Sequence, residues 1–157
     1  MGYDGHKKIK GIKISVLVDL QGLPLSIIIV PANKNDSTLY IPTLKNFNIK
    51  RPIGRPVNRP SKVTADAMYD TAKIRKYNRR RGIKSNIPVN KRNRKKKKIG
   101  RPIKVDQEEY KKKSIVERFF SWIESCKKVF PRYEIKETSY LGVVMVAAII
   151  RLNELLG

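Results

Sequence analysis

Apolar residues near the start of the chain alternate with polar ones, and this pattern predicts a β-hairpin over residues 12–31. Ile14, Val16, Val18 and Leu20 fall at every second position, the period of a strand with one packed face. Gln21-Gly22 marks the turn. The nearly continuous apolar run over residues 25–30 predicts a second strand that is buried on both faces.

The middle of the chain predicts short strands that alternate with helices. Asp36 is expected to cap a helix that runs to about Phe47. A short strand over residues 62–65 leads to Asp66, and a helix is expected from about Thr71 to Arg81, where Gly82 ends it. Residues 83–89 then form another short extended segment.

Two helices are expected in the last third of the chain. A long helix begins at Asp106, with Glu109 completing a capping box, and it presents a broad apolar stripe that contains Phe119 and Trp122. A final helix, from about Ser139 to Leu156, is apolar nearly all round in its first half and should pack across the long helix. The whole order predicts an α/β fold, with helices flanking a small mixed sheet.

The length of 157 residues suits one domain over residues 1–157, and two basic loops are expected within it. The loop over residues 50–61 is proline-rich, which excludes a helix or a central strand. The loop over residues 91–105 is a low-complexity basic stretch, expected to be mobile and solvated when free. Both loops contain Gly-Arg-Pro, which suits either an extended minor-groove contact or, as we favour, a linker that contacts phosphates without reading sequence.

The charge of the chain indicates a polyanionic partner. Lys and Arg number 36 against 13 Asp and Glu, a formal net charge of +23. A compact body with this charge repels itself, and binding to nucleic acid relieves the repulsion while releasing counterions. The single cysteine, Cys126, excludes an intrachain disulfide and fits a reducing cytosol, and the single histidine, His6, makes a histidine-based metal site improbable. The longest apolar run, residues 141–150, is too short to cross a membrane.

Carboxylates are scarce in this chain, so their positions are informative. Asp66 follows a short strand in the segment TADAMYDT, and Glu117 lies within SIVERFF on the expected long helix. On spacing alone, a salt bridge to one of the many Lys or Arg residues is the more probable role for either. The alternative is a site for Mg²⁺, a hard cation that one or two carboxylates and substrate phosphates suffice to hold.

Four segments together resemble one protein family, the DDE transposases of bacterial and archaeal insertion sequences. They are residues 2–37, 62–71 (KVTADAMYDT), 79–89 (RRRGIKSNIPV) and 110–133, which contain VERFFSWI. The resemblance implies a ribonuclease H-like catalytic domain that cleaves and joins DNA with Mg²⁺ or Mn²⁺. It also implies element ends and target DNA as partners, a homo-oligomer or a full-length transposase as a further partner, and a prokaryotic, cytoplasmic, nucleoid-associated location.

The resemblance assigns roles to particular residues. Asp66 resembles the second catalytic aspartate and Glu117 the catalytic glutamate, and both would bind the metal. Tyr110 and Lys113 match the residues that precede that glutamate, whereas Glu124 stands where the family has a lysine. Lys127 or Lys128 could take over that DNA contact, and the full set of residues expected to contact DNA is Lys113, Arg118, Lys127, Lys128, Arg55, Arg101, Lys95, Lys96 and Lys97. Asp19, Asp36 and Asp70 resemble a hairpin aspartate and two helix caps.

The family's first catalytic aspartate lies on a strand that precedes the GYDGHKKIKG segment, with which this chain begins. We therefore expect a catalytic domain that lacks its first strand and has little or no strand transfer alone. Two alternatives stay open. The chain can be a DNA-binding or regulatory protein that occupies element DNA without cutting it, or a basic nucleic-acid-binding protein of ribosomal type, which would explain the charge but not the Asp66 and Glu117 motifs.

Overall fold

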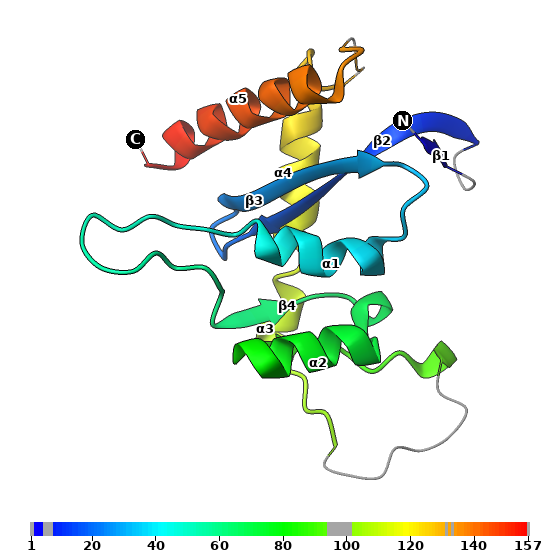
Figure 1. Cartoon of the computed structure of the whole chain (residues 1–157), viewed down its shortest axis with the longest axis vertical. Helices are drawn as coiled ribbons and strands as arrows, with labels where there is room; N and C mark the ends of the chain where they lie inside the picture. Colours follow the sequence, from blue (N-terminus) through cyan, green and yellow to red (C-terminus); the bar gives the residue numbers. More distant parts are fainter. Residues whose placement is uncertain (1, 5–7, 94–101, 131, 133, 157) are drawn as a thin grey trace.

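The computed structural model describes residues 2–4, 8–93, 102–130, 132 and 134–156. Strands and helices alternate along the chain, and a column of elements runs from α5 at one end to α2 near the other (Figure 1). In chain order the elements are β1 (Gly2–Asp4), β2 (Ile9–Val18), β3 (Pro24–Pro31), α1 (Asp36–Lys45), β4 (Lys62–Thr64), η1 (Ala67–Tyr69), α2 (Ala72–Arg81), β5 (Lys84–Asn86), η2 (Lys91–Asn93), α3 (Gln107–Lys111), α4 (Ser114–Glu124) and α5 (Glu137–Leu156). The α/β class expected from the sequence is confirmed, but the described strands form two sheets, one antiparallel and one parallel, instead of the single mixed sheet that was expected.

The predicted hairpin is formed by β2 and β3, which pair antiparallel from Ile12–Pro31 to Val18–Pro24. Asp19 closes the turn, because its Oδ1 accepts hydrogen bonds from the backbone N–H groups of Gln21 and Leu23 at 2.8 and 2.9 Å. Gly22 has a φ of +92°, which favours glycine. β1 pairs with the first part of β2, so the sheet order is β1-β2-β3.

The expectation that the second hairpin strand is buried on both faces is wrong. Only Ser26 and Ile27 are buried in β3, and its other residues are half-buried. β3 lies at the edge of the three-stranded sheet, between α5 and α1 (Figure 1). These helices cover the middle of the strand and leave its ends partly open to solvent.

A second, parallel sheet is made of β4 and β5, which pair over Lys62–Lys84, Val63–Ser85 and Thr64–Asn86. The helix between them, α2, confirms the sequence prediction. Thr71 caps it by accepting from the N–H of Ile74, and Gly82 ends it in the left-handed conformation, with a φ of 64°. One hydrophobic cluster joins this sheet to the helices around it, and consists of Tyr40, Leu44, Val63, Ile74, Ile83 and Ile87.

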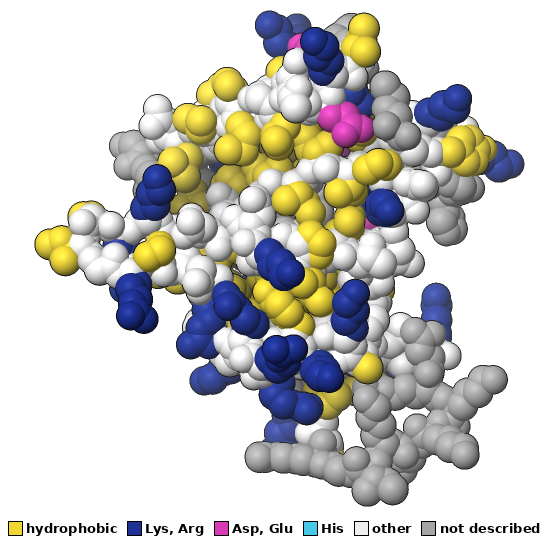
Figure 2. All heavy atoms as spheres, viewed as in Figure 1, with side chains coloured by type: hydrophobic (Ala, Val, Ile, Leu, Met, Phe, Trp, Pro, Cys, Tyr) yellow, Lys and Arg dark blue, Asp and Glu magenta, His cyan; other side chains and the backbone are white. Residues whose placement is uncertain are grey.

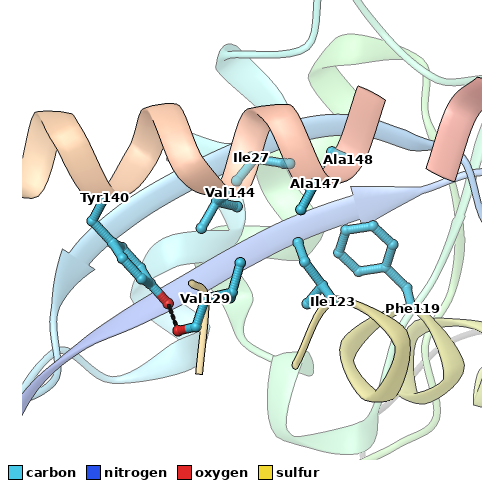
Figure 3. Close-up of a cluster of buried hydrophobic side chains, with 8 residues drawn as sticks. All are labelled: Ile27, Phe119, Ile123, Val129, Tyr140, Val144, Ala147 and Ala148. Carbon is cyan, nitrogen blue, oxygen red and sulfur yellow. Dashed lines mark hydrogen bonds between the residues drawn. The ribbon is translucent and has the colours of Figure 1, made fainter. Parts of the chain in front are cut away.

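The other hydrophobic cluster lies where α4 and α5 cross the β2–β3 hairpin. Figure 3 shows Val144 and Ala147 of α5 pointing toward the side chains of α4, among them Ile123, while Ala148 lies beside Ile27 of β3. Tyr140 adds a hydrogen bond from its hydroxyl to the carbonyl of Val129, at 3.3 Å. The prediction that the final helix packs across its predecessor is therefore confirmed.

The helix predicted to start at Asp106 is in fact two helices, α3 and α4, with a turn at Lys112 and Lys113. Asp106 caps α3 as expected, accepting from the N–H of Glu109 at 3.2 Å. The reciprocal half of the capping box is not made. The N–H of Asp106 donates to Asn86 Oδ1 at 2.8 Å, and the Glu109 carboxylate pairs instead with Lys62 at 2.5 Å.

Two further caps differ from the sequence predictions. Asn35, rather than Asp36, caps α1, because its Oδ1 accepts from the N–H of Ser37, while Asp36 pairs with Lys13 at 2.8 Å. Asp70 does not cap α2. Its carboxylate instead accepts from Arg75 at 2.8 Å and from the N–H of Asn90 at 2.9 Å, and so ties the helix to the segment after β5.

The structure describes the first basic loop in full but only part of the second. Residues 50–61 form an irregular loop, as predicted, closed at its base by an isolated bridge between Ile49 and Val57. Much of the second loop, residues 94–101, lies outside the described residues, so its expected mobility is not described here. In the part of the chain that the structure does describe, no helix is long and apolar enough to span a membrane.

Candidate functional site

A pocket of about 220 Å³ lies between the two sheets. One wall is the end of β2, from Ser15 to Val18, and the facing wall is the β4 segment from Val63 to Asp66. Tyr40, Thr43 and Leu44 of α1 close one side, and Lys113, Val116 and Glu117 border another. The sequence places these segments far apart in the chain, and the fold brings them to one cavity.

Asp66 lies two residues after the end of β4, at the cap position of η1, with an exposed side chain. Its Oδ1 accepts two hydrogen bonds, from the Tyr110 hydroxyl at 3.2 Å and from Lys113 Nζ at 2.9 Å. Tyr110 belongs to α3, and Lys113 to the turn before α4. The carboxylate is therefore oriented by two donors from the segment that the sequence motif singled out.

Glu117 lies in the first turn of α4 and lines the same pocket as Asp66. The N-terminal end of a helix carries partial positive charge, which favours a carboxylate there. The pKa of Lys113, one turn earlier, is affected by both carboxylates. The hydrogen bond to Asp66 and the charge of that group raise the pKa of Lys113, and the charge of Glu117 adds a smaller contribution in the same direction.

A network of polar side chains fixes α3 against β4 and β5, and so sets the position of Tyr110 and Lys113. Lys62 of β4 pairs with Asp106 at 3.0 Å and with Glu109 at 2.5 Å. These hydrogen bonds raise the pKa of Lys62 and lower the pKa of Asp106. Asn86 of β5 accepts from the N–H of Asp106 and donates to its carbonyl, at 2.8 and 3.1 Å.

The structure contains the ion pair that spacing alone favoured for Asp66, with Lys113 as its partner. About half of each side chain is exposed, 43% for Lys113 and 51% for Asp66, and exposed pairs of this kind contribute only about 0–1 kcal/mol to stability. The pair therefore gives little structural reason for a carboxylate at this place. Two carboxylates at one pocket also suit a hard divalent cation, which needs few protein ligands when substrate phosphates complete its coordination.

The described residues contain no group of three or more His, Cys, Asp or Glu side chains that could hold a metal ion. Asp66 and Glu117 are the two carboxylates that line the pocket, so they are the residues here that could hold a cation. Mg²⁺ is usually bound by one or two carboxylates together with substrate phosphates.

The other basic residues expected to contact DNA lie apart from the pocket. Arg118 lies beside the hairpin turn with Gln21 and Gly22, while Lys127 and Lys128 are exposed after the end of α4. Arg55 is exposed in the loop over residues 50–61. Four more of these residues fall outside the described part of the chain, namely Lys95, Lys96, Lys97 and Arg101.

The sequence analysis missed Lys62, which holds the two acids at the start of α3. It also missed the basic residues of α2, although their density in AKIRKYNRRR is visible in the sequence. Lys62 shows no such signal, because its partners are more than forty positions away in the chain, at a separation of 44 residues for Asp106.

Comparison with known proteins identifies the family to which this chain belongs. The family model described as "Transposase DDE domain" matches residues 1–150. A Burkholderia cepacia protein, assigned as a transposase for insertion sequence element IS402, is 38% identical over 74 residues. That alignment covers 46% of this chain and spans 35% of the length of the relative. No solved structure matches the chain.

Because the family model covers nearly the whole sequence, the chain belongs to the insertion-sequence DDE transposases, as its motifs indicated. The family acts in DNA transposition, and DNA is its partner.

Proposed function

We propose that Asp66 and Glu117 are metal-binding carboxylates of a centre that cleaves and joins DNA strands, built on a ribonuclease H-like fold. One observation carries the proposal: Asp66 and Glu117, on separate elements and far apart in the chain, border one pocket. The contacts of Asp66 with Tyr110 and Lys113, the residues that precede Glu117 in the family motif, support it.

A divalent cation at this place would activate a water or a 3′-hydroxyl and stabilise the leaving oxygen of a phosphodiester. The protein side chains have separate tasks. Asp66 and Glu117 supply hard oxygen ligands, and Tyr110 fixes one Asp66 oxygen by donating to it at 3.2 Å. Lys113 neutralises Asp66 in the structure described here, and its flexible cationic side chain can turn to a substrate phosphate when Asp66 takes another partner.

We propose that a third carboxylate enters beside Asp66 through the groove between β2 and β4. A second hollow, of about 590 Å³, extends the pocket along the ends of these strands, past Leu17 and Val18 on one side and Val63 and Thr64 on the other. In the family that the chain resembles, the first catalytic aspartate lies on a strand that precedes the β1–β2 segment. A strand in this groove would place an aspartate close to Asp66.

A second candidate function is DNA binding without cleavage. The lack of a three-carboxylate group among the described residues favours it, because transfer in line with the leaving group requires the full set of charges around the phosphate. The two candidates share a fold and a DNA partner, and they differ only in whether a strand is cut.

An assay of strand nicking separates the two candidates. Its substrate is a supercoiled plasmid that carries the DNA flanking the chain's own reading frame. In a full-length transposase, which supplies the third carboxylate, we expect nicking in Mn²⁺ or Mg²⁺ to be lost in Asp66→Asn and in Glu117→Gln, each by about a hundredfold or more, because a positioned charge at a reacting phosphate is worth several kcal/mol. Asp36→Asn is the matched control, because Asp36 lies outside the pocket and pairs with Lys13.

Retained nicking in Asp66→Asn would contradict the assignment of that residue. Tight DNA binding by the full-length transposase that contains these residues, with no nicking in either metal, would favour the second candidate.

A further inference from the structure

The exposed face of α2 is unusually basic. Six of its ten residues are Lys or Arg, in AKIRKYNRRR, and the helix contains no acidic residue. Ile74 and Asn78 face inward and are buried, and the opposite side presents only small or cationic side chains. We define the α2 basic face as the exposed residues Lys73, Lys76, Arg79, Arg80 and Lys84, the last of which follows on β5.

Among the residues that the structure describes, no recorded ion pair joins a carboxylate to the α2 basic face. The ion pairs of the described residues involve other cations, and the acid nearest in sequence, Asp70, pairs with Arg75 on the inner side of the helix. Figure 2 shows Lys and Arg side chains gathered over the region where Figure 1 places α2 and β4, while the Asp and Glu side chains visible in that view lie higher on the molecule. Like charges held this close repel one another, so a bound polyanion stabilises the face.

Buried contacts hold the helix firmly beneath these charges. The Asn78 amide donates to the Tyr40 hydroxyl at 2.7 Å and to Ser85 Oγ at 2.8 Å, and Arg75 Nη2 donates to the carbonyl of Ile87 at 2.7 Å. Lys73, Lys76 and Arg80 therefore lie on one strip, with rises of about 4.5 and 6 Å between them from helix geometry. Each strand of a duplex carries one phosphate per ~3.4 Å of the duplex axis, so a strip of this length can face several phosphates.

The proline-rich loop extends the same surface. Arg59 donates from Nη1 to the carbonyl of Arg81, and Arg81 Nη2 donates to the carbonyl of Asn58 at 2.9 Å. The guanidinium of Arg59 also lies against Gly82, where a Cβ would collide with it. These contacts fasten the loop over residues 50–61, with its exposed Arg55, to the C-terminal end of α2.

We propose that the α2 basic face and the adjoining loop bind the phosphate backbone of duplex DNA without reading its sequence, as a surface separate from the Asp66–Glu117 pocket. None of the five residues lines that pocket. Duplex DNA fits better than a membrane surface, because a helix that lies on a membrane needs large apolar side chains on its outer face and α2 presents none there. The proposal rests on the proposed function only for the choice of DNA as the polyanion.

The test is binding of the whole chain to a short fluorescent duplex of scrambled sequence, followed by anisotropy over a range of KCl concentrations in EDTA. The variant is Lys73→Ala/Lys76→Ala/Arg80→Ala, and Lys10→Ala/Lys45→Ala/Lys136→Ala is a control that removes the same charge from other exposed positions. Each phosphate contact contributes about 0.9 to the slope of log K against log salt, so we expect the α2 variant to lower that slope by about three and the affinity by about tenfold or more.

A third variant, Lys73→Arg/Lys76→Arg/Arg80→Lys, keeps the charge and should bind as the wild type does. The control triple should keep most of the slope, and a duplex of a second sequence should bind equally well. Equal losses in the α2 triple and the control triple would overturn the proposal, as would binding that depends on the duplex sequence or that survives the α2 triple unchanged.

Thermal unfolding shows whether each variant is folded, and we expect unchanged midpoints because the replaced side chains are exposed. Since the assay contains no divalent cation, its outcome is independent of strand cleavage. The two proposals can therefore fail separately. Asp66→Asn is expected to lose nicking but keep DNA binding, whereas the α2 triple is expected to lose DNA binding.

Discussion

Asn78 is the residue at which several elements around the pocket meet. Its amide is fully buried and donates to Tyr40 of α1 and to Ser85 of β5, while its backbone carbonyl accepts from Ile83 at 2.8 Å. A buried N–H group costs free energy unless it is hydrogen-bonded, so the two bonds donated by Asn78 Nδ2 favour one arrangement of α1, α2 and β5 over others. Tyr40 in turn lines the pocket that contains Asp66.

Tyr40 should also give the protein a measurable alkaline transition. Burial raises the pKa of Tyr40 from 10.0 to about 12. Because the folded-state pKa lies above the unfolded one, the associated stability is fully present below pH 10 and is lost as the pH rises toward 12. We expect the free energy of unfolding in urea to fall by about 2 kcal/mol more in the wild type than in Tyr40→Phe across this range.

At neutral pH the same substitution should lower the free energy of unfolding by about 1–3 kcal/mol, because it leaves one N–H of Asn78 without its acceptor. Parallel pH profiles for Tyr40→Phe and the wild type would show that Tyr40 does not carry the alkaline transition.

At the scale of elements, the β2–β3 hairpin depends on the Asp19 carboxylate, which accepts two backbone N–H groups across the turn. The hairpin forms one wall of the pocket, so its turn matters for the site as well as for the sheet. The resemblance assigned Asp19 to the hairpin and not to the metal, and these hydrogen bonds support that distinction.

We expect Asp19→Ala to lower the free energy of unfolding by about 1–2 kcal/mol, since both backbone donors lose their acceptor. Asp19→Asn keeps a side-chain oxygen at the same place and should cost less. Urea denaturation of the three proteins measures both values, and equal losses in the two variants would assign the effect to charge and not to the acceptor.

The elements also show what the sequence alone can and cannot predict. The spacing of apolar residues and the capping residues were sufficient to predict the hairpin, α2 between Thr71 and Gly82, and α5, because these signals are local. The division between α3 and α4 was missed, and so were the contacts that hold the start of α3, because Asn86 and Lys62 are distant in sequence from Asp106 and Glu109. Asn35 replaced Asp36 as the cap of α1 because Lys13, on β2, draws Asp36 away.

The candidate site, too, was predictable from the sequence only in part. Asp66 and Glu117 were found through motifs, but their shared pocket depends on how β4 and α4 approach β2, which no local pattern specifies. The contact of Tyr110 with Asp66 also spans 44 positions in the chain.

At the scale of the whole molecule, two hydrophobic clusters support the site from opposite sides. One joins α4 and α5 to the hairpin, and the other joins α1 and α2 to the β4–β5 sheet. The pocket lies between β2 and β4, where the two halves meet. The chain has a net charge of +23, and the proposed polyanion-binding face lies on the same framework as the pocket with Asp66 and Glu117.

The central claim is that Asp66 and Glu117 form one metal site. Binding of Mn²⁺ to the purified chain, followed by electron paramagnetic resonance of the free ion, tests it directly. We expect Asp66→Asn and Glu117→Gln each to weaken binding by about tenfold or more, the double variant to lose little beyond either single one, and Asp36→Asn to bind as the wild type does. Unchanged binding in either single variant, or losses that simply add in the double variant, would contradict a shared site.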